Sequence, residues 1–263
     1  LYKLFSKYSS YFTIARIDGT SVGSINGIAI MNDKYDLLKE FWYSLNSIND
    51  IFDNWCNSFL GNWISTYRGF YNNGLYSNKK LNNILISSLQ ESWNMKSTLY
   101  KDKFSCVVVN IDTAKSEYIY GSNKNIIDYV TASASPWIVT NPIKIDNYFF
   151  TDGCLLETYP IKHINKCNAD LTVIIGYDQE HIKFNNTDNN NLLEYLANII
   201  DIGRFNSYNC NKIKELIEDK NIITISNPMK SSLLNFNQES IQYGFVQGEE
   251  FADSFFKNYL NTN

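Results

Sequence analysis

Two continuous apolar runs rich in β-branched residues constrain the fold of this chain more than any other feature. Residues 106–109 read Cys-Val-Val-Val, and residues 171–175 read Leu-Thr-Val-Ile-Ile. A strand with one solvated face alternates apolar and polar residues, so these runs predict strands that are buried on both faces of a sheet. The predicted strands, including further segments of similar character, are Tyr11–Ile17, Phe104–Ile111, Glu117–Tyr120, Ile143–Thr151, Leu171–Tyr177 and Asn221–Ser226.

Segments with helical periodicity lie between many of these strands. They are Val22–Met31, Lys34–Leu45, Lys79–Glu91, Lys124–Ala134, Asn191–Gly203, Asn211–Asp219 and Glu239–Lys257, the last with a break near Gly248. Alternating strands and helices are typical of layered α/β domains, and buried β-branched strands favour a largely parallel sheet. A chain of 263 residues is short enough for one such domain, so we expect residues 1–263 to form a single unit.

Two segments between these elements stand out by composition. Asn185–Asn191 is a polar tract typical of a solvated loop. Trp42–Tyr76 is unusually aromatic. Its aromatic residues fit either amphipathic helices that pack into the core or a cap over an acyl-chain pocket.

Charge and composition argue against several classes of function. The formal net charge is -4 and no long Lys/Arg run occurs, whereas a nucleic-acid groove requires a clustered basic face. No segment approaches the ~20 apolar residues of a membrane-spanning helix. The irregular cysteine spacing favours free thiols in a reducing compartment over a zinc site or disulfide framework. We therefore expect a cytoplasmic protein that binds no nucleic acid, metal or cofactor. The cysteines are Cys56, Cys106, Cys154, Cys167 and Cys210.

The strongest local motif is Gly19-Thr20-Ser21-Val22-Gly23, which fits the pattern G-x-S-x-G. It lies between a predicted strand and a predicted helix, as a nucleophile elbow requires. In such an elbow Ser21 has a strained backbone and an exposed hydroxyl, and the two glycines avoid clashes across the turn. The positive N-terminal end of the following helix favours developing negative charge. The motif therefore predicts a catalytic serine.

A catalytic serine needs a base, and the chain has only two histidines, His163 and His181. The order Ser21, Asp152, His163 permits the triad of an α/β-hydrolase esterase. However, His163 follows Asp152 closely, beyond a turn with Pro160, in a helical-looking segment where a histidine is more often a surface or capping residue. The pair Asp152-Gly153 also fits a simple turn.

The region around Asp152 resembles the second signature block of the patatin-like phospholipases. That block has a helix end of small residues and proline, a short hairpin, Asp-Gly followed by Gly or Ala, and a turn with Asn and Pro. The matching residues are Ala132, Ser133, Pro136, Pro142, Asp152, Gly153 and Pro160. The segment GTSVGSINGIAI at residues 19–30 is similar to the first block of the family. Further similarity lies in residues 41–45, 74–85 and 231–252, so the resemblance covers nearly the whole chain.

This resemblance implies a three-layer α/β/α fold and hydrolysis of carboxylic esters in lipids or phospholipids, as by a phospholipase A. It implies a dyad in which Ser21 forms an acyl-serine intermediate and Asp152 is the general base. Burial beside the serine would raise the pKa of such a base above its ordinary value of about 3.9. Peripheral contact with a membrane is compatible with this activity. The residues with supporting roles at the elbow, the oxyanion site and the Asp-Gly turn are Gly19, Thr20, Val22, Gly23 and Gly153.

The chain departs from the family pattern in three places. A Gly-rich oxyanion loop precedes the nucleophile strand in the family, and Leu1–Asp18 contains no such run, so we expect this strand and loop to be missing. Cys154 replaces a Gly or Ala, and Asp18 replaces a small or apolar residue. Asp18 would raise the pKa of Asp152 if it pointed inward and would have little effect if it pointed to solvent. Two alternatives stay open: a patatin-shaped pseudoenzyme that binds lipid or a protein partner, and a Ser-Asp-His esterase.

Overall fold

The computed structural model describes residues 7–54, 73–94, 102–167, 169–177, 222–227 and 238–262. The predicted helices Asn191–Gly203 and Asn211–Asp219, the polar tract Asn185–Asn191 and His181 lie outside these ranges. Residues 55–72 of the aromatic segment Trp42–Tyr76 also lie outside them.

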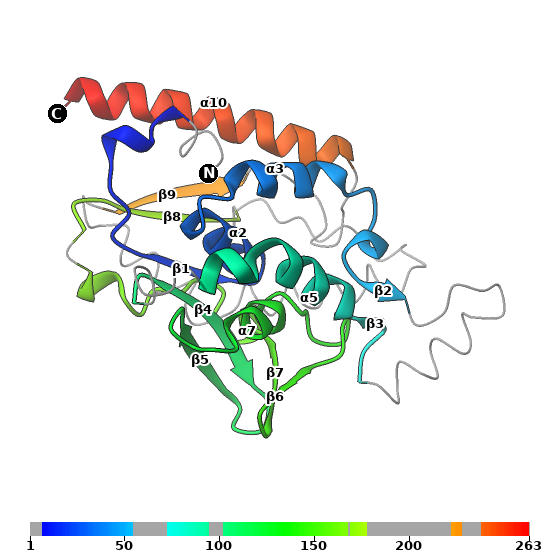
Figure 1. Ribbon diagram of the computed structural model, residues 1–263. Helices are drawn as coiled ribbons and strands as arrows, with labels where there is room; N and C mark the ends of the chain where they lie inside the picture. Colours follow the sequence, from blue (N-terminus) through cyan, green and yellow to red (C-terminus); the bar gives the residue numbers. More distant parts are fainter. Residues whose placement is uncertain are drawn as a thin grey trace, which may run out of the picture.

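A five-stranded sheet is organised around β4, Phe104–Asn110 (Figure 1). Strand β5, Lys115–Tyr120, pairs with β4 from Ser105 to Asn110 along one edge of β4. Two strands share the opposite edge of β4, namely β1, Ile17–Thr20, and β7, Tyr148–Asp152. Strand β6, Ile143–Ile145, pairs with β7.

The α/β class is confirmed, but the prediction of a largely parallel sheet is wrong. Within the described five-stranded sheet only β1 and β4 pair in parallel, whereas the β4–β5, β4–β7 and β6–β7 pairs are antiparallel. The physical reason is that β4–β5 and β6–β7 are hairpins, and a short turn can join only antiparallel neighbours. The predicted strand Ile143–Thr151 is one of these hairpins, because the chain reverses at residues 146–147.

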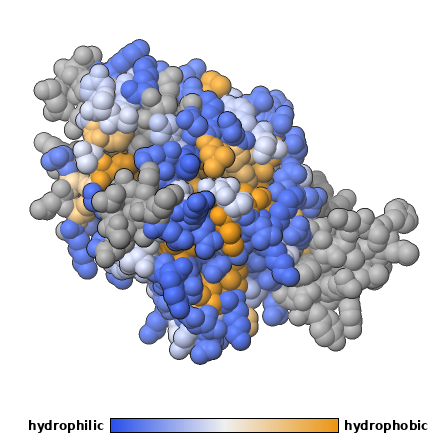
Figure 2. Space-filling view, viewed as in Figure 1, coloured by the Kyte–Doolittle hydropathy of each residue, from blue (hydrophilic) through white to orange (hydrophobic). Residues whose placement is uncertain are grey.

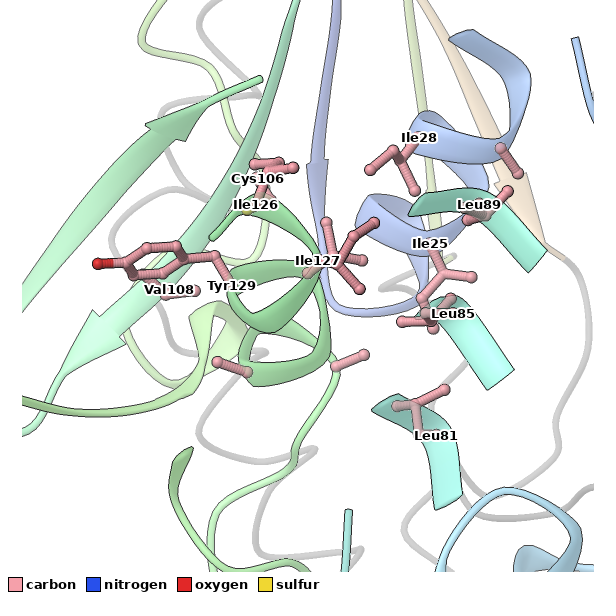
Figure 3. Close-up of a cluster of buried hydrophobic side chains, with 14 of the residues drawn as sticks. Ile25, Ile28, Leu81, Leu85, Leu89, Cys106, Val108, Ile126, Ile127 and Tyr129 are labelled. Atoms are coloured by element: carbon pink, nitrogen blue, oxygen red, sulfur yellow. The ribbon is translucent and has the colours of Figure 1, made fainter. Parts of the chain in front are cut away.

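Helices flank this sheet and enclose the core (Figure 1). They are α2, Val22–Met31; α3, Tyr35–Ser44; α5, Lys79–Leu85, which continues as the π-helical segment η3, Ile86–Gln90; α7, Ile126–Ser133; and α10, Gln238–Thr262. Buried side chains of α2, α5 and α7 meet those of β4, as Figure 3 shows. Every residue of β4 is buried, which confirms the prediction of a strand covered on both faces.

The remaining strands form two smaller sheets. Strand β8, Thr172–Tyr177, pairs in parallel with β9, Ile222–Asn227. Strand β2, Asp53–Asn54, pairs with β3, Tyr76–Ser77. The prediction that the run at residues 171–175 is buried on both faces is wrong, because Val173 and Ile175 remain exposed.

Two other predicted boundaries differ from the structure. The strand expected at Tyr11–Ile17 begins only at Ile17, because hydrogen-bonded pairing with β4 starts there. The break expected near Gly248 is absent, and α10 is continuous. A glycine inside a helix costs about 1 kcal/mol relative to alanine, which a long packed helix tolerates. None of the described helices is long and apolar enough to cross a membrane.

Candidate active site

The carboxyl ends of β1 and β7 meet on the same edge of β4. Thr20, the last residue of β1, lies opposite Val107, and Asp152, the last residue of β7, lies opposite Val108. The two strands run toward each other, since β1 is parallel to β4 and β7 is antiparallel to it. This register brings Ser21, the residue after β1, to Asp152.

Ser21 has the strained backbone that a nucleophile elbow requires. It precedes α2 with φ 57° and ψ -129°, a region that costs a non-glycine residue about 1–3 kcal/mol. Its carbonyl oxygen accepts hydrogen bonds from the N–H of Ser24 at 2.8 Å and from the Ser24 hydroxyl at 2.6 Å. Its own N–H donates to Ser133 Oγ at 3.0 Å. These bonds hold the turn between β1 and α2.

The side chains of Ser21 and Asp152 are in direct contact. Ser21 Oγ donates to Asp152 Oδ2 at 2.7 Å. The N–H of Cys154 donates to the other carboxylate oxygen, Oδ1, at 2.8 Å. Asp152 is only 5% exposed, whereas Ser21 is half-buried. The carboxylate is therefore oriented with one oxygen toward the serine hydroxyl, which is the geometry for removing its proton.

Two motif glycines are required by close backbone contacts. A Cβ on Gly19 would lie 2.4 Å from the carbonyl oxygen of Gly23, and a Cβ on Gly153 would lie 2.4 Å from that of Val107. Thr20 is buried, and its Cγ2 would lie 2.9 Å from the Gly153 Cβ. The steric prediction for Gly23 is wrong, because a Cβ there would meet nothing within 4 Å.

Ser133 supports the elbow. The sequence indicated Ser133 only as one of the small residues at the helix end of the second signature block. It ends α7, is fully buried and accepts the N–H of Ser21. Its hydroxyl donates to the carbonyl oxygen of Val107 at 2.6 Å, at the point where β1 and β7 meet. Its position shortly before Pro136, in the matched block, was the sequence feature that could have indicated a role. Its contact with Ser21 is seen only in the tertiary structure.

Replacing Ser133 by alanine is expected to destabilise the protein and loosen the elbow. Ser133→Ala leaves the half-buried Ser21 N–H and the buried Val107 carbonyl without this partner, and each group left unsatisfied costs about 1–3 kcal/mol. Urea unfolding measures the loss. Ser87→Ala is the control, because that exposed hydroxyl bonds only a carbonyl of its own helix. Equal unfolding free energies for the two variants would contradict the assigned support.

Asp18 and His163 bind each other and not the dyad. Asp18 accepts from Arg16 Nε at 2.8 Å and from Ser105 Oγ at 2.5 Å, and its Oδ2 lies 3.2 Å from His163 Nδ1. The second ring nitrogen of His163, Nε2, lies 2.9 Å from Tyr120 Oη. Both nitrogens of His163 thus have partners other than Ser21 and Asp152. The structure does not bring together the triad that the chain order permitted with His163.

His163 is expected to make the stability of the protein depend on pH. Burial lowers the pKa of His163 below its ordinary value of 6.5, although the neighbouring Asp18 carboxylate opposes this shift. Below about pH 6.5 the unfolded chain therefore binds this proton before the folded protein does. We expect the free energy of unfolding to fall from that pH down to the folded pKa. Urea unfolding between pH 7.5 and 5 measures the slope, and an equal slope in His163→Asn would contradict this origin.

The start of α2 lies at the place where the sequence predicted an oxyanion donor. The N–H groups of the first helical turn have no partner within the helix, and Val22 is the first residue of α2. Gly23, the next residue, is exposed. The positive end of the helix dipole lies at the same place.

Exposed apolar side chains lie on the segment that follows Asp152 and on the segment that its N–H contacts. Leu155 and Leu156 follow it closely and are exposed. Trp137, also exposed, lies two residues after Ser135, whose carbonyl oxygen accepts the N–H of Asp152 at 3.1 Å. Figure 2 shows apolar residues in separate groups between hydrophilic ones on one face of the molecule. The part of the chain that the structure describes contains no group of three or more His, Cys, Asp or Glu side chains placed to hold a metal ion.

Comparison with protein families gives one match over more than half of the chain. The family model for patatin-like phospholipase matches residues 12–164, which include the elbow, Asp152 and His163. Comparison with curated protein sequences gives no significant match.

Proposed function

This chain belongs to the patatin-like phospholipase family, and from that membership we propose that it is a lipid acyl hydrolase with Ser21 and Asp152 as its catalytic dyad. The observation that carries the proposal is the 2.7 Å hydrogen bond from Ser21 Oγ to Asp152 Oδ2. The strained elbow adds support, because such backbone conformations persist mainly where function requires them.

The reaction follows from the positions of these groups. Asp152 Oδ2 takes the proton from Ser21 Oγ as the oxygen attacks the carbonyl carbon of a lipid ester. The N–H of Val22 and the start of α2 stabilise the resulting oxyanion. Collapse of this intermediate breaks the ester bond, and the departing alkoxide takes the proton from Asp152. A water molecule then gives a proton to Asp152 and attacks the acyl-serine. Asp152 returns this proton to Ser21 Oγ as the acyl-oxygen bond breaks, which releases the fatty acid and restores Ser21.

The substrate class is supported by the apolar side chains near the dyad. Lipid acyl chains need apolar surface, and Leu155, Leu156 and Trp137 offer it on the two segments joined at Asp152. Peripheral contact with a membrane agrees with such a surface.

A pseudoenzyme of the same shape, which would bind lipid or a protein partner without hydrolysis, is the alternative that the probe experiment must distinguish. Loss of one oxyanion donor alone reduces the rate by about 10²–10³-fold, so the Ser21–Asp152 pair needs such a donor for full activity.

A fluorophosphonate probe distinguishes these candidates. We expect the wild-type chain to form a covalent adduct that mass spectrometry maps to Ser21, and Ser21→Ala to form none. Fatty-acid release from phospholipid vesicles then measures hydrolysis. A folded wild-type chain without adduct and without fatty-acid release would contradict the hydrolase and favour the pseudoenzyme.

The same probe tests the triad esterase. A dyad retains most of its labelling rate when His163 and His181 are both replaced by asparagine, whereas a triad loses about 10⁴-fold.

A further inference from the structure

A partly buried polar cluster joins the two chain segments that carry the dyad. It consists of Arg16, Asp18, Ser105, Tyr120 and His163, which we call the Asp18 cluster. Asp18 lies on β1 shortly before Ser21, and His163 lies at the end of the segment that follows Asp152. Hydrogen bonds connect all five side chains, through Asp18 and the His163 ring.

The cluster anchors a short strand whose end begins the elbow. Strand β1 is four residues long, and its only partner among the described strands is β4. Ser105 Oγ on β4 and Arg16 both hold the Asp18 carboxylate, while Arg16 Nη1 donates to the carbonyl oxygen of Asp102 at 2.7 Å. Because β1 leads directly into the strained elbow, its position sets the position of Ser21.

The segment after Asp152 is attached to the sheet at two places. Glu157 accepts hydrogen bonds from Ser116 and Tyr118 on β5. His163 binds Asp18 on β1 and Tyr120 on β5. The segment therefore spans from the catalytic aspartate back to the strand that carries the serine.

We propose that Asp18 and His163 are positioning residues that hold the β1 elbow and the segment after Asp152 in the register at which Ser21 meets its base. This inference rests on the dyad proposed above, and neither residue touches the reacting atoms. A change at a residue far from the chemistry that displaces a reacting group by about 1 Å reduces the rate by up to about 10²-fold.

The contacts of His163 fit the neutral ring. In that form Nδ1–H donates to Asp18, and Nε2 accepts from Tyr120 Oη–H. The groups that face the ring are Asp18 and Arg16 beside β1 and Tyr118 and Tyr120 on β5. Lys162 adjoins it in the chain and lies over the Tyr118 ring.

Protonation of this ring would disturb the cluster. A proton on Nε2 turns this nitrogen into a donor, so Tyr120 Oη must accept where it donated before. It also places a second cation beside the Asp18 carboxylate, which already pairs with Arg16. The burial that lowers the pKa of His163 agrees with this assignment. Acidification is therefore expected to weaken the attachment of β1.

The test compares variants of His163 by probe labelling and hydrogen exchange. His163→Leu removes both hydrogen bonds, whereas His163→Asn keeps an N–H donor near the Nδ1 position, toward Asp18. Lys166→Gln, an exposed change at the last residue of the short helix that follows His163, is the control. We expect His163→Leu to lower the maximal labelling rate of Ser21 about tenfold, with little change in the probe concentration for half-maximal rate. We expect His163→Asn to stay within about threefold of wild type, and Lys166→Gln to equal it.

Backbone amide exchange in residues 17–24 provides a readout that needs no activity. It should be faster in His163→Leu and in Asp18→Asn than in wild type. The labelling rate of His163→Asn should fall less than that of wild type between pH 7 and 5, because the asparagine does not titrate. This pH comparison still decides the matter if His163→Leu does not fold.

Unchanged amide exchange and labelling in His163→Leu would overturn the inference, as would identical pH profiles of wild type and His163→Asn. If the wild-type chain itself is not labelled, the dyad fails. Amide exchange in residues 17–24 then still supports or refutes the positioning of β1 by this cluster.

Discussion

Asp152→Asn is expected to lower the rate of acyl transfer at Ser21 by about 10²–10⁴-fold, the usual contribution of a general base. The N–H of Cys154 requires an acceptor, so the amide oxygen of the asparagine takes the position of Oδ1. The amide NH₂ then faces Ser21 Oγ, where the wild type has an acceptor at 2.7 Å. A group that donates hydrogen bonds cannot remove the serine proton, although the side chain keeps its shape.

The measurement is the rate of labelling by the fluorophosphonate probe, followed by release of fatty acid from phospholipid. Asp170→Asn makes the same chemical change at an exposed aspartate and is the matched control. Labelling and hydrolysis at the wild-type rate in Asp152→Asn would exclude Asp152 as the base. Circular dichroism of the three proteins establishes that the fold is retained.

Gly19→Ala is expected to destabilise the protein by about 1–3 kcal/mol or more, and Gly23→Ala is not. The Cβ of alanine at position 19 would lie 2.4 Å from the carbonyl oxygen of Gly23 and 2.6 Å from the backbone nitrogen of Ser24. These are backbone atoms at the start of α2, so the turn must move. At position 23 the new Cβ meets nothing within 4 Å, and alanine favours the helix by up to about 1 kcal/mol.

Urea unfolding of the two variants measures this difference within one motif. Gly153→Ala extends the comparison to β7, where the new Cβ would lie 2.4 Å from the carbonyl oxygen of Val107. Probe labelling should fall with stability in Gly19→Ala and Gly153→Ala, because both changes separate the strand ends that carry the dyad. Similar unfolding free energies for Gly19→Ala and Gly23→Ala would show that the backbone contact does not constrain the elbow.

Local sequence patterns predicted much of the site. The helix Val22–Met31 has the predicted bounds, and the G-x-S-x-G motif lies at the turn before it. The continuous β-branched run at residues 106–109 correctly indicated a strand buried on both faces. These features depend on the periodicity and conformational preferences of neighbouring residues, which a sequence displays directly.

The direction of the strands was harder to predict. A buried β-branched run looks the same in a parallel and in an antiparallel pair, so it does not specify its partners. The two hairpins made the sheet mixed, and β1 proved to begin only where it pairs with β4. The sequence did not indicate that Asp18 and His163 contact each other, because the two residues lie 145 positions apart in the chain.

The sequence by itself determined the family, the elbow and the residue types that can carry the chemistry, because short motifs encode local backbone geometry. Only the tertiary structure decided that Ser21 reaches Asp152 across 131 positions of the chain, and that His163 turns to Asp18. Those contacts follow from the register of β1 and β7 on one edge of β4. Register is set by the burial and hydrogen bonding of the whole sheet, which no local pattern contains.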